Sequence, residues 1–168
     1  MNTFSSLLAR MTRGLSAAAS LLLVGLFVSA CAVPSTSPST PDTATLGASL
    51  QLCTDEINRY RASVGLAPLS RSSSLEQFAA DAAQHDAAAG VPHTLFRQTN
   101  GGGVAMAETE LLLWPNRTVQ DVIKLGLSEM WKQGPAGEHY DILAGPYTQI
   151  GCGVFVSDGV VSVTQDYK

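Results

Sequence analysis

The sequence predicts an α+β domain in which helices pack in layers against a sheet. Apolar residues recur at helical spacing in the earlier part of the domain, whereas its last two segments alternate and are rich in valine, isoleucine and threonine. Cys53 and Cys152 would connect the first of these helices to the strands near the end of the chain. Helices first, strands late and such a link are typical of a layered α+β arrangement.

The first two helices are predicted from the spacing of apolar and small residues. A helix over residues 50–64 carries an apolar face formed by Leu50, Cys53, Ile57 and Tyr60. Gly65 is expected to end this helix. A second helix over residues 74–89 has a narrow stripe of small residues, which permits close packing. Ser73 and Glu76 have the spacing of a capping box at its start.

A third helix is predicted over residues 119–133. Thr118 and Asp121 supply an N-cap and an acidic first turn. Gly126 interrupts this helix at a cost of about 1 kcal/mol relative to alanine. The buried face of the helix is formed by Val122, Ile123, Leu127, Met130 and Trp131.

Three strands complete the predicted domain. Residues 148–156 and 160–166 alternate apolar and polar side chains, and the Asp158-Gly159 pair between them is typical of the turn in a β-hairpin. An earlier strand around residues 108–114 contains three consecutive leucines, which indicates a buried run.

The chain begins with a predicted secretory signal peptide, residues 1–30. A basic start is followed by an apolar run over residues 15–28 that is too short for a secure membrane span. The segment Val28-Ser29-Ala30-Cys31 resembles a bacterial lipobox, which implies cleavage before Cys31 and lipid attachment to its sulfur. The alternative is an ordinary signal peptide with an incidental cysteine.

Lipid attachment would anchor the protein firmly, since each buried methylene contributes about 0.8 kcal/mol. Ala32 follows the cysteine where an aspartate would indicate inner-membrane retention. Outer-membrane anchoring, facing the periplasm or the exterior, is therefore expected if the source is Gram-negative. Residues 31–47 form a tether rich in serine, threonine and proline, which cannot bury enough apolar surface to fold alone. The folded domain is expected over residues 48–168.

Charge and cysteine content limit the class of this domain. A formal net charge of −4 and the lack of a basic cluster beyond the tether argue against binding to nucleic acid. With Cys31 lipidated, Cys53 and Cys152 remain, and two cysteines in an exported protein indicate one disulfide. The alternative is a pair of buried free thiols.

Several sequence pieces, in this order and spacing, resemble the CAP superfamily of cysteine-rich secretory proteins, antigen 5 and pathogenesis-related 1 proteins, also called SCP-like domains. The resemblance covers about residues 49–168. It is carried by residues 56–61, residues 65–69, Gln84-His85, Pro92-His93, Ala107-Glu108, Met130-Trp131, Gly137-Glu138-His139-Tyr140 and residues 147–153. The family implies a three-layer α-β-α sandwich with a central antiparallel sheet and a surface cleft.

The family resemblance places two histidines and two glutamates around that cleft. By position, His93, Glu108 and His139 match three of them. The second glutamate is expected near the end of the third helix, and the candidates for it are Glu129, Gln133 and Glu138. The alternative is a site with only three members. A glutamine would keep the hydrogen bonding but lose the negative charge, which would weaken a bound cation.

Three roles are open for the cleft. His93 and His139 are candidate ligands of a divalent metal such as zinc, which binds imidazole nitrogen. With such a metal, Glu108 would serve as base toward the bound water in a peptidase-like or cell-wall-directed hydrolase. Alternatively, the three side chains satisfy one another in a structural network, because an unpaired buried polar group costs about 1–3 kcal/mol.

The preferred interpretation is a binding or interaction module, lipid-anchored in the bacterial cell envelope, rather than an enzyme. Its expected partners are the membrane, through the N-terminal lipid, and a ligand that is a lipid, a cell-wall fragment or an envelope protein. Gln133, at the place where the resemblance leads us to expect a glutamate, favours binding over catalysis.

Overall fold

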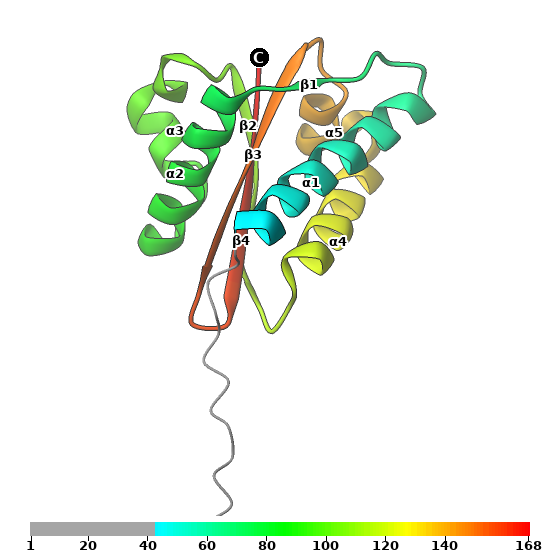
Figure 1. Ribbon diagram of the computed structural model, residues 1–168. Helices are drawn as coiled ribbons and strands as arrows, with labels where there is room; N and C mark the ends of the chain where they lie inside the picture. The colour runs from blue at the N-terminus through cyan, green and yellow to red at the C-terminus, as the bar shows by residue number, and fades with distance from the viewer. Residues whose placement is uncertain (1–42) are drawn as a thin grey trace, which may run out of the picture. The chain divides into compact units, whose positions relative to one another are not determined.

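The computed structural model describes residues 43–168 and shows a sheet between two layers of helices (Figure 1). On one side lie α2 (Ser73–Ala89) and α3 (Thr94–Thr99); on the other lie α1 (Thr43–Ser63), α4 (Val119–Lys132) and α5 (Glu138–Leu143). The predicted three-layer α+β fold class is thereby confirmed. In the described part of the chain, no helix is long and apolar enough to cross a membrane.

The sheet has the strand order β1-β3-β4-β2. The predicted hairpin forms β3 (Gln149–Ser157) and β4 (Val160–Tyr167), and β4 also pairs antiparallel with β2 (Ala107–Pro115). The family resemblance implies an antiparallel sheet. The short strand β1 (Ser70–Arg71), however, pairs with β3 in parallel, so the sheet is mixed. A strand of two residues has no alternation that a sequence pattern could detect.

A bulge interrupts β2 within the predicted leucine run. Leu111 pairs with Val163 and Trp114 with Val161, so β2 carries one extra residue between these pairs. Leu113, inside the bulge, has a φ of 55°, in the left-handed region. Only Leu111 of the three leucines is buried. The expected buried run is therefore wrong beyond Leu111, because the bulge turns the strand out of the core.

Helix α1 begins at Thr43, seven residues before the expected start at Leu50. The last residues of the predicted tether, 43–47, are thus helical. No proline occurs between Pro41 and Pro68, so nothing in this part of the sequence bars a helix. The predicted signal peptide, the predicted lipidation site Cys31 and the rest of the predicted tether lie outside the described residues.

Helix α2 packs closely on β3 because two glycines of the strand leave room for it. A Cβ atom at Gly151 would lie 2.2 Å from the backbone of Leu75 and Glu76. A Cβ atom at Gly153 would lie 2.1 Å from the backbone of Ala79. The predicted stripe of small residues on the helix is therefore matched by glycines on the strand.

The capping box expected at the start of α2 is not formed. The helix already begins at Ser73, its N-cap is Ser72, and no side chain caps it. The Glu76 carboxylate instead forms an ion pair with Arg71 in β1. With Ser72 as the N-cap, Glu76 lies one position beyond the place that a capping box requires, and Arg71 from the neighbouring strand binds its carboxylate.

Helix α4 has the predicted N-cap, since Thr118 accepts a hydrogen bond from the backbone N–H of Asp121 at 3.1 Å. Its glycine also has a packing role. A Cβ atom at Gly126 would lie 2.3 Å from the Leu111 side chain on β2. The helix thus gives up about 1 kcal/mol of propensity and gains a close approach to the sheet.

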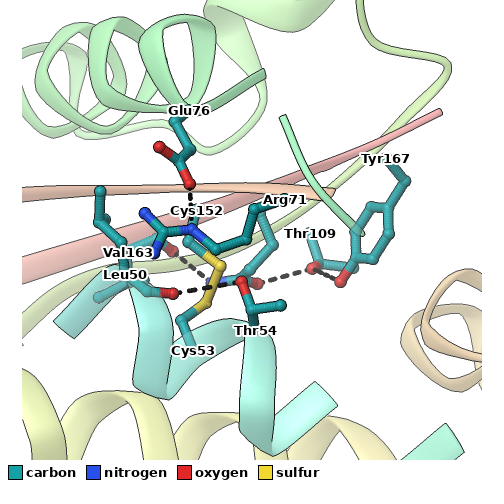
Figure 2. The surroundings of a disulfide bond; sticks show 10 residues. Leu50, Cys53, Thr54, Arg71, Glu76, Thr109, Cys152, Val163 and Tyr167 are labelled. Atoms are coloured by element: carbon teal, nitrogen blue, oxygen red, sulfur yellow. Dashed lines mark hydrogen bonds and ion pairs between the residues drawn. A yellow bond between two sulfur atoms is a disulfide. The ribbon is translucent and has the colours of Figure 1, made fainter. Parts of the chain in front are cut away.

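The predicted disulfide joins Cys53 of α1 to Cys152 of β3, with a Cα–Cα distance of 6.4 Å (Figure 2). Both cysteines are buried in the core. The bond closes a loop with a sequence separation of 99 residues, so it spans most of the domain. It fixes the helical layer of α1 to the sheet at one point.

Buried Arg61 joins α1 to the end of α5. Its guanidinium donates hydrogen bonds to the carbonyl oxygens of Ala67 at 3.0 Å, Leu143 at 2.9 Å and Gly145 at 2.8 Å. The residue is only 3% exposed. Because α5 contributes to the pocket described next, Arg61 helps to hold one wall of that pocket in place.

Candidate functional site

A pocket with a volume of about 450 Å³ lies between α5, the start of β2 and the segment around α3. His93 and Glu108 line it from one side, and Glu138 and His139 line it from α5. The structure therefore brings the three best-defined candidate residues, His93, Glu108 and His139, to one concave surface. The apolar part of the lining comes from Phe96, Ala107 and Ile142.

His93 and Glu108 form a hydrogen-bonded pair. The imidazole Nδ1 lies 2.8 Å from Glu108 Oε1. The Glu108 side chain is 1% exposed, while the His93 side chain is 29% exposed and reaches the pocket. The hydrogen bond to Glu108 raises the pKa of His93, and burial opposes this only in part. The pair is thus a buried carboxylate that orients a half-exposed imidazole, an arrangement suited to binding or to proton transfer.

The backbone around His93 is held by buried carboxylates. His93 has a φ of 60°, which is uncommon for a residue other than glycine. Its N–H donates to Glu110 Oε2 at 3.0 Å. The next two N–H groups, of Thr94 and Leu95, donate to the Asp86 carboxylate at 2.9 Å each. These bonds fix the left-handed conformation and thereby the direction of the imidazole.

His139 is held by Gln133 from the end of α4. Gln133 Nε2 lies 2.8 Å from His139 Nδ1, and Gln133 Oε1 accepts from the His139 N–H at 3.3 Å. With the amide in this orientation, Nδ1 is the acceptor and the ring proton is carried by Nε2. The glutamine therefore sets the tautomer of the second histidine without adding a charge.

The three candidates for the fourth cleft position differ in their surroundings. Glu129 is 66% exposed and forms an ion pair with Lys132 at 2.8 Å, apart from the residues that line the pocket. Gln133 bonds to His139 but does not line the pocket. Glu138 lines it directly. Of the three candidates, only Glu138 therefore contributes to the pocket lining.

Three buried carboxylates behind the pocket were missed from the sequence. Glu110, Asp86 and Asp166 are 8%, 0% and 0% exposed, respectively. Glu110 is two residues after Glu108 on β2 and shares its face of the sheet. The alternation Glu108-Thr109-Glu110 in a predicted strand was the available signal. Nothing local in the sequence marks Asp86 or Asp166 as buried.

Burial changes the protonation of this acidic group. It raises the pKa of Glu110 to about 7, with smaller contributions from the charges of Asp86 and Glu108. It raises the pKa of Asp166 to about 9, and the charges of Glu108, Glu110 and Asp86 add to the effect. Near neutral pH the sheet therefore carries protonated or half-protonated carboxyl groups beside the His93–Glu108 pair.

His93 and His139 were predicted as the ligands of one metal ion, but the structure brings a different set of possible ligands together. One ligand atom each from His93, Glu108 and Glu110 lies within 4.8 Å of the other two. Among the described residues, His139 belongs to no such group of three. Imidazole and carboxylate donors of this kind fit zinc or a similar divalent ion. The pairing of His93 with His139 on one metal stays a prediction.

Two solved structures show the same fold. One is an outer surface protein from Borrelia burgdorferi, 17% identical, with a TM-score of 0.52 over 70% of this chain and 89% of that one. The other is an extracellular protein containing an SCP domain from Bacillus anthracis, 19% identical, with a TM-score of 0.51 over 79% of this chain and 45% of that one. At such identities the likeness concerns the fold alone.

The sequence also matches a family model. Residues 54–167 match the model described as the cysteine-rich secretory protein family, CAP. Among curated proteins none matches the chain. Because the family model covers more than half of the sequence and the fold agrees, the chain belongs to the cysteine-rich secretory protein (CAP) family.

Proposed function

We propose that this protein is an exported, lipid-anchored module of the bacterial cell envelope that binds a ligand in the pocket between α3, β2 and α5. The observation that carries the proposal is the convergence of His93 and His139 on that pocket, each oriented by a side chain behind it. Ligand sites typically combine an apolar lining with a few fixed polar groups. Phe96, Ala107 and Ile142 supply the apolar part of this lining.

Export is supported by the N-terminal sequence and by the disulfide. The basic start, apolar run and Cys31 have the pattern of a lipoprotein signal. A disulfide such as Cys53–Cys152 persists in oxidising compartments outside the cytosol. The two similar structures are named as an outer surface protein and an extracellular protein. These observations agree with anchoring in the envelope.

A cell-wall fragment fits the pocket better than a lipid tail or a protein surface. Arg97 and Glu138 line the pocket beside the two histidines, so it offers charges of both signs. A short peptide of the cell wall carries carboxylate, amide and amine groups that match such a lining. A lipid tail would bury these charged groups without partners, which is costly. A volume of about 450 Å³ suits a small ligand.

Calorimetric titration of a soluble disaccharide–peptide fragment of peptidoglycan into the purified protein tests this proposal. We expect binding that weakens about tenfold, or about 1.4 kcal/mol, in His139→Ala and in Arg97→Ala. Glu129→Gln is the matched control, because Glu129 is exposed and outside the pocket lining. It should bind as the unmodified protein does. Absence of binding, or equal binding by all variants, would overturn the proposed ligand site.

The hydrolase alternative has one observation in its favour, the His93–Glu108 pair. A carboxylate that orients an imidazole is a common arrangement for a general base. Mass spectrometry of the same fragment after incubation separates the two functions. Unchanged fragment supports a binding module. Cleavage that disappears in His93→Ala would establish the enzyme instead.

A further inference from the structure

Behind the pocket, four carboxylates form what we call the buried acidic layer: Asp86, Glu108, Glu110 and Asp166. Glu108 and Glu110 come from β2, Asp166 from β4 and Asp86 from α2. Each of the four residues is at most 8% exposed. Buried carboxylates need partners, because removing a charge from water costs several kcal/mol.

Two members of the layer have such partners. Asp86 accepts hydrogen bonds from two backbone N–H groups and lies 2.9 Å from a nitrogen of His85. Glu110 accepts from the His93 N–H at 3.0 Å and from the Thr164 hydroxyl at 3.3 Å. These two side chains are therefore accounted for by the protein itself.

The other two members are only partly paired. Glu108 Oε1 bonds to His93, but Glu108 Oε2 and both carboxyl oxygens of Asp166 are buried without a hydrogen-bond partner among the described residues. An unpaired buried polar group costs about 1–3 kcal/mol. These three atoms are the ones that a bound cation could contact.

The strand register directs these unpaired oxygens to one place. Asp166 lies opposite Glu108 on β2 and opposite Gly151 on β3. Residues opposite each other in an antiparallel pair share a face of the sheet, with Cβ atoms about 4.5–5.5 Å apart. Gly151 faces α2, so Glu108 and Asp166 also face the space beneath that helix. Glu110, two residues along β2, faces the same space.

We propose that the buried acidic layer holds one divalent transition-metal ion, zinc or manganese, ligated by His93, Glu108 and Glu110 with Asp166 beside it. One ligand atom from each of the three ligands lies within 4.8 Å of the other two. Two ligands of one zinc ion, each at about 2.0–2.2 Å, are at most roughly 4.4 Å apart, so small side-chain movements close the site. One imidazole with carboxylates suits these ions.

This site is distinct from a metal held between the two histidines of the pocket. Its ligands include Glu110 on β2, and they do not include His139. It also goes beyond the proposed ligand binding, because the ion is held whether or not the pocket binds a cell-wall fragment. Its effect would be to neutralise the layer and to fix the start of α3 to the sheet.

The test is to strip the purified protein with a chelator and titrate it with Zn²⁺ and, separately, Mn²⁺ by calorimetry. Elemental analysis of the reloaded protein gives the stoichiometry. We expect one ion per chain, with an affinity that falls at least about tenfold in Glu110→Gln and in Asp166→Asn. His139→Ala is the matched control and should change the affinity by less than about twofold. Circular dichroism checks that each variant is folded.

Three results would overturn the proposal. The first is that the unmodified protein binds neither ion, which would mean that protons alone neutralise the layer. The second is that the ion binds but the folded acidic-layer variants, Glu110→Gln and Asp166→Asn, retain the full affinity. The third is that His139→Ala loses the ion while the acidic-layer variants keep it, which would place the metal in the pocket between the two histidines. Pocket binding of the peptidoglycan fragment is measured separately, so the two proposals fail independently.

Discussion

Glu108 and Asp166 lie directly opposite each other on β2 and β4, both buried under α2, and neither donates to or accepts from the other. Two carboxyl groups in this relationship cannot both be ionised at low cost. Burial raises the pKa of Asp166 to about 9, and the negative charge of Glu108 adds to this effect. The charge of this buried pair therefore depends on pH.

Without a metal ion, the protein should lose stability as the pH rises. The folded-state pKa values are about 7 for Glu110 and about 9 for Asp166. Ordinary values are about 4, so between these limits the folded state binds more protons than the unfolded chain. The stability that these two carboxyl groups contribute is fully present below about pH 4. It is lost as the pH rises through their folded-state pKa values.

Urea denaturation of the chelator-treated protein at about pH 5 and about pH 8 measures this effect. The free energy of unfolding should be lower at the higher pH, and Asp166→Asn should make it less dependent on pH. If the unmodified protein were equally stable or more stable at about pH 8, the assigned protonation would be contradicted.

Loss of the disulfide should strongly destabilise the domain. Cys53 and Cys152 close a loop with a sequence separation of 99 residues, for which chain entropy gives about 4–5 kcal/mol as an upper figure. The double variant Cys53→Ser with Cys152→Ser should lose about 2–5 kcal/mol of unfolding free energy. Chemical denaturation measures it, and reduction of the unmodified protein is the control. A loss below about 1 kcal/mol would show that the packing alone holds α1 on the sheet.

Gly153→Ala should be one of the most damaging small substitutions. The new methyl group would meet the backbone of Ala79 and Ala80 within 2.1 Å, and a backbone cannot rotate away as a side chain can. We expect a loss of about 1–3 kcal/mol, typical of overpacking. Gly47→Ala in α1 is the matched control, because nothing lies within 4 Å of its Cβ position. The control should be neutral or slightly stabilising in a thermal melt.

Replacing Arg61 should loosen α5. Arg61→Met keeps most of the side-chain volume but removes the donors to the carbonyls of Leu143 and Gly145. Hydrogen bonds of charged groups contribute about 1.5–3 kcal/mol each. Faster amide exchange in residues 138–145 is expected, with partial recovery in Arg61→Lys. Exchange unchanged in this segment would mean that Arg61 does not hold the pocket wall.

Local patterns in the sequence were sufficient to predict much of the fold. The Asp158-Gly159 turn, the Thr118 cap and the apolar face of α4 depend on residues close to one another in the chain, and all three are present. The disulfide followed from the two cysteines that remain in an exported protein once Cys31 is assigned to lipid attachment. The capping box failed because the helix begins one residue earlier than predicted, with Ser72 as its N-cap, and because Arg71 from another element binds Glu76.

The acidic layer could be predicted only in part, because it depends on pairing between distant strands. Glu108 was named through family resemblance, and alternation would place Glu110 on the same face of β2. The burial of Asp166 follows from the register of β4 against β2 and from α2 above it. Neither the register nor the covering helix is encoded near residue 166. The same holds for Asp86, which binds backbone N–H groups eight and nine residues further along the chain.

A crystal of the full protein soaked in zinc gives the most direct test of the central claim. An anomalous difference map should show one peak within about 2.0–2.2 Å of the Glu110 carboxylate and in contact with His93 and Glu108. A peak that bridges His93 and His139 without reaching Glu110, or no ordered zinc at all, would contradict the assignment of the buried acidic layer as a metal site.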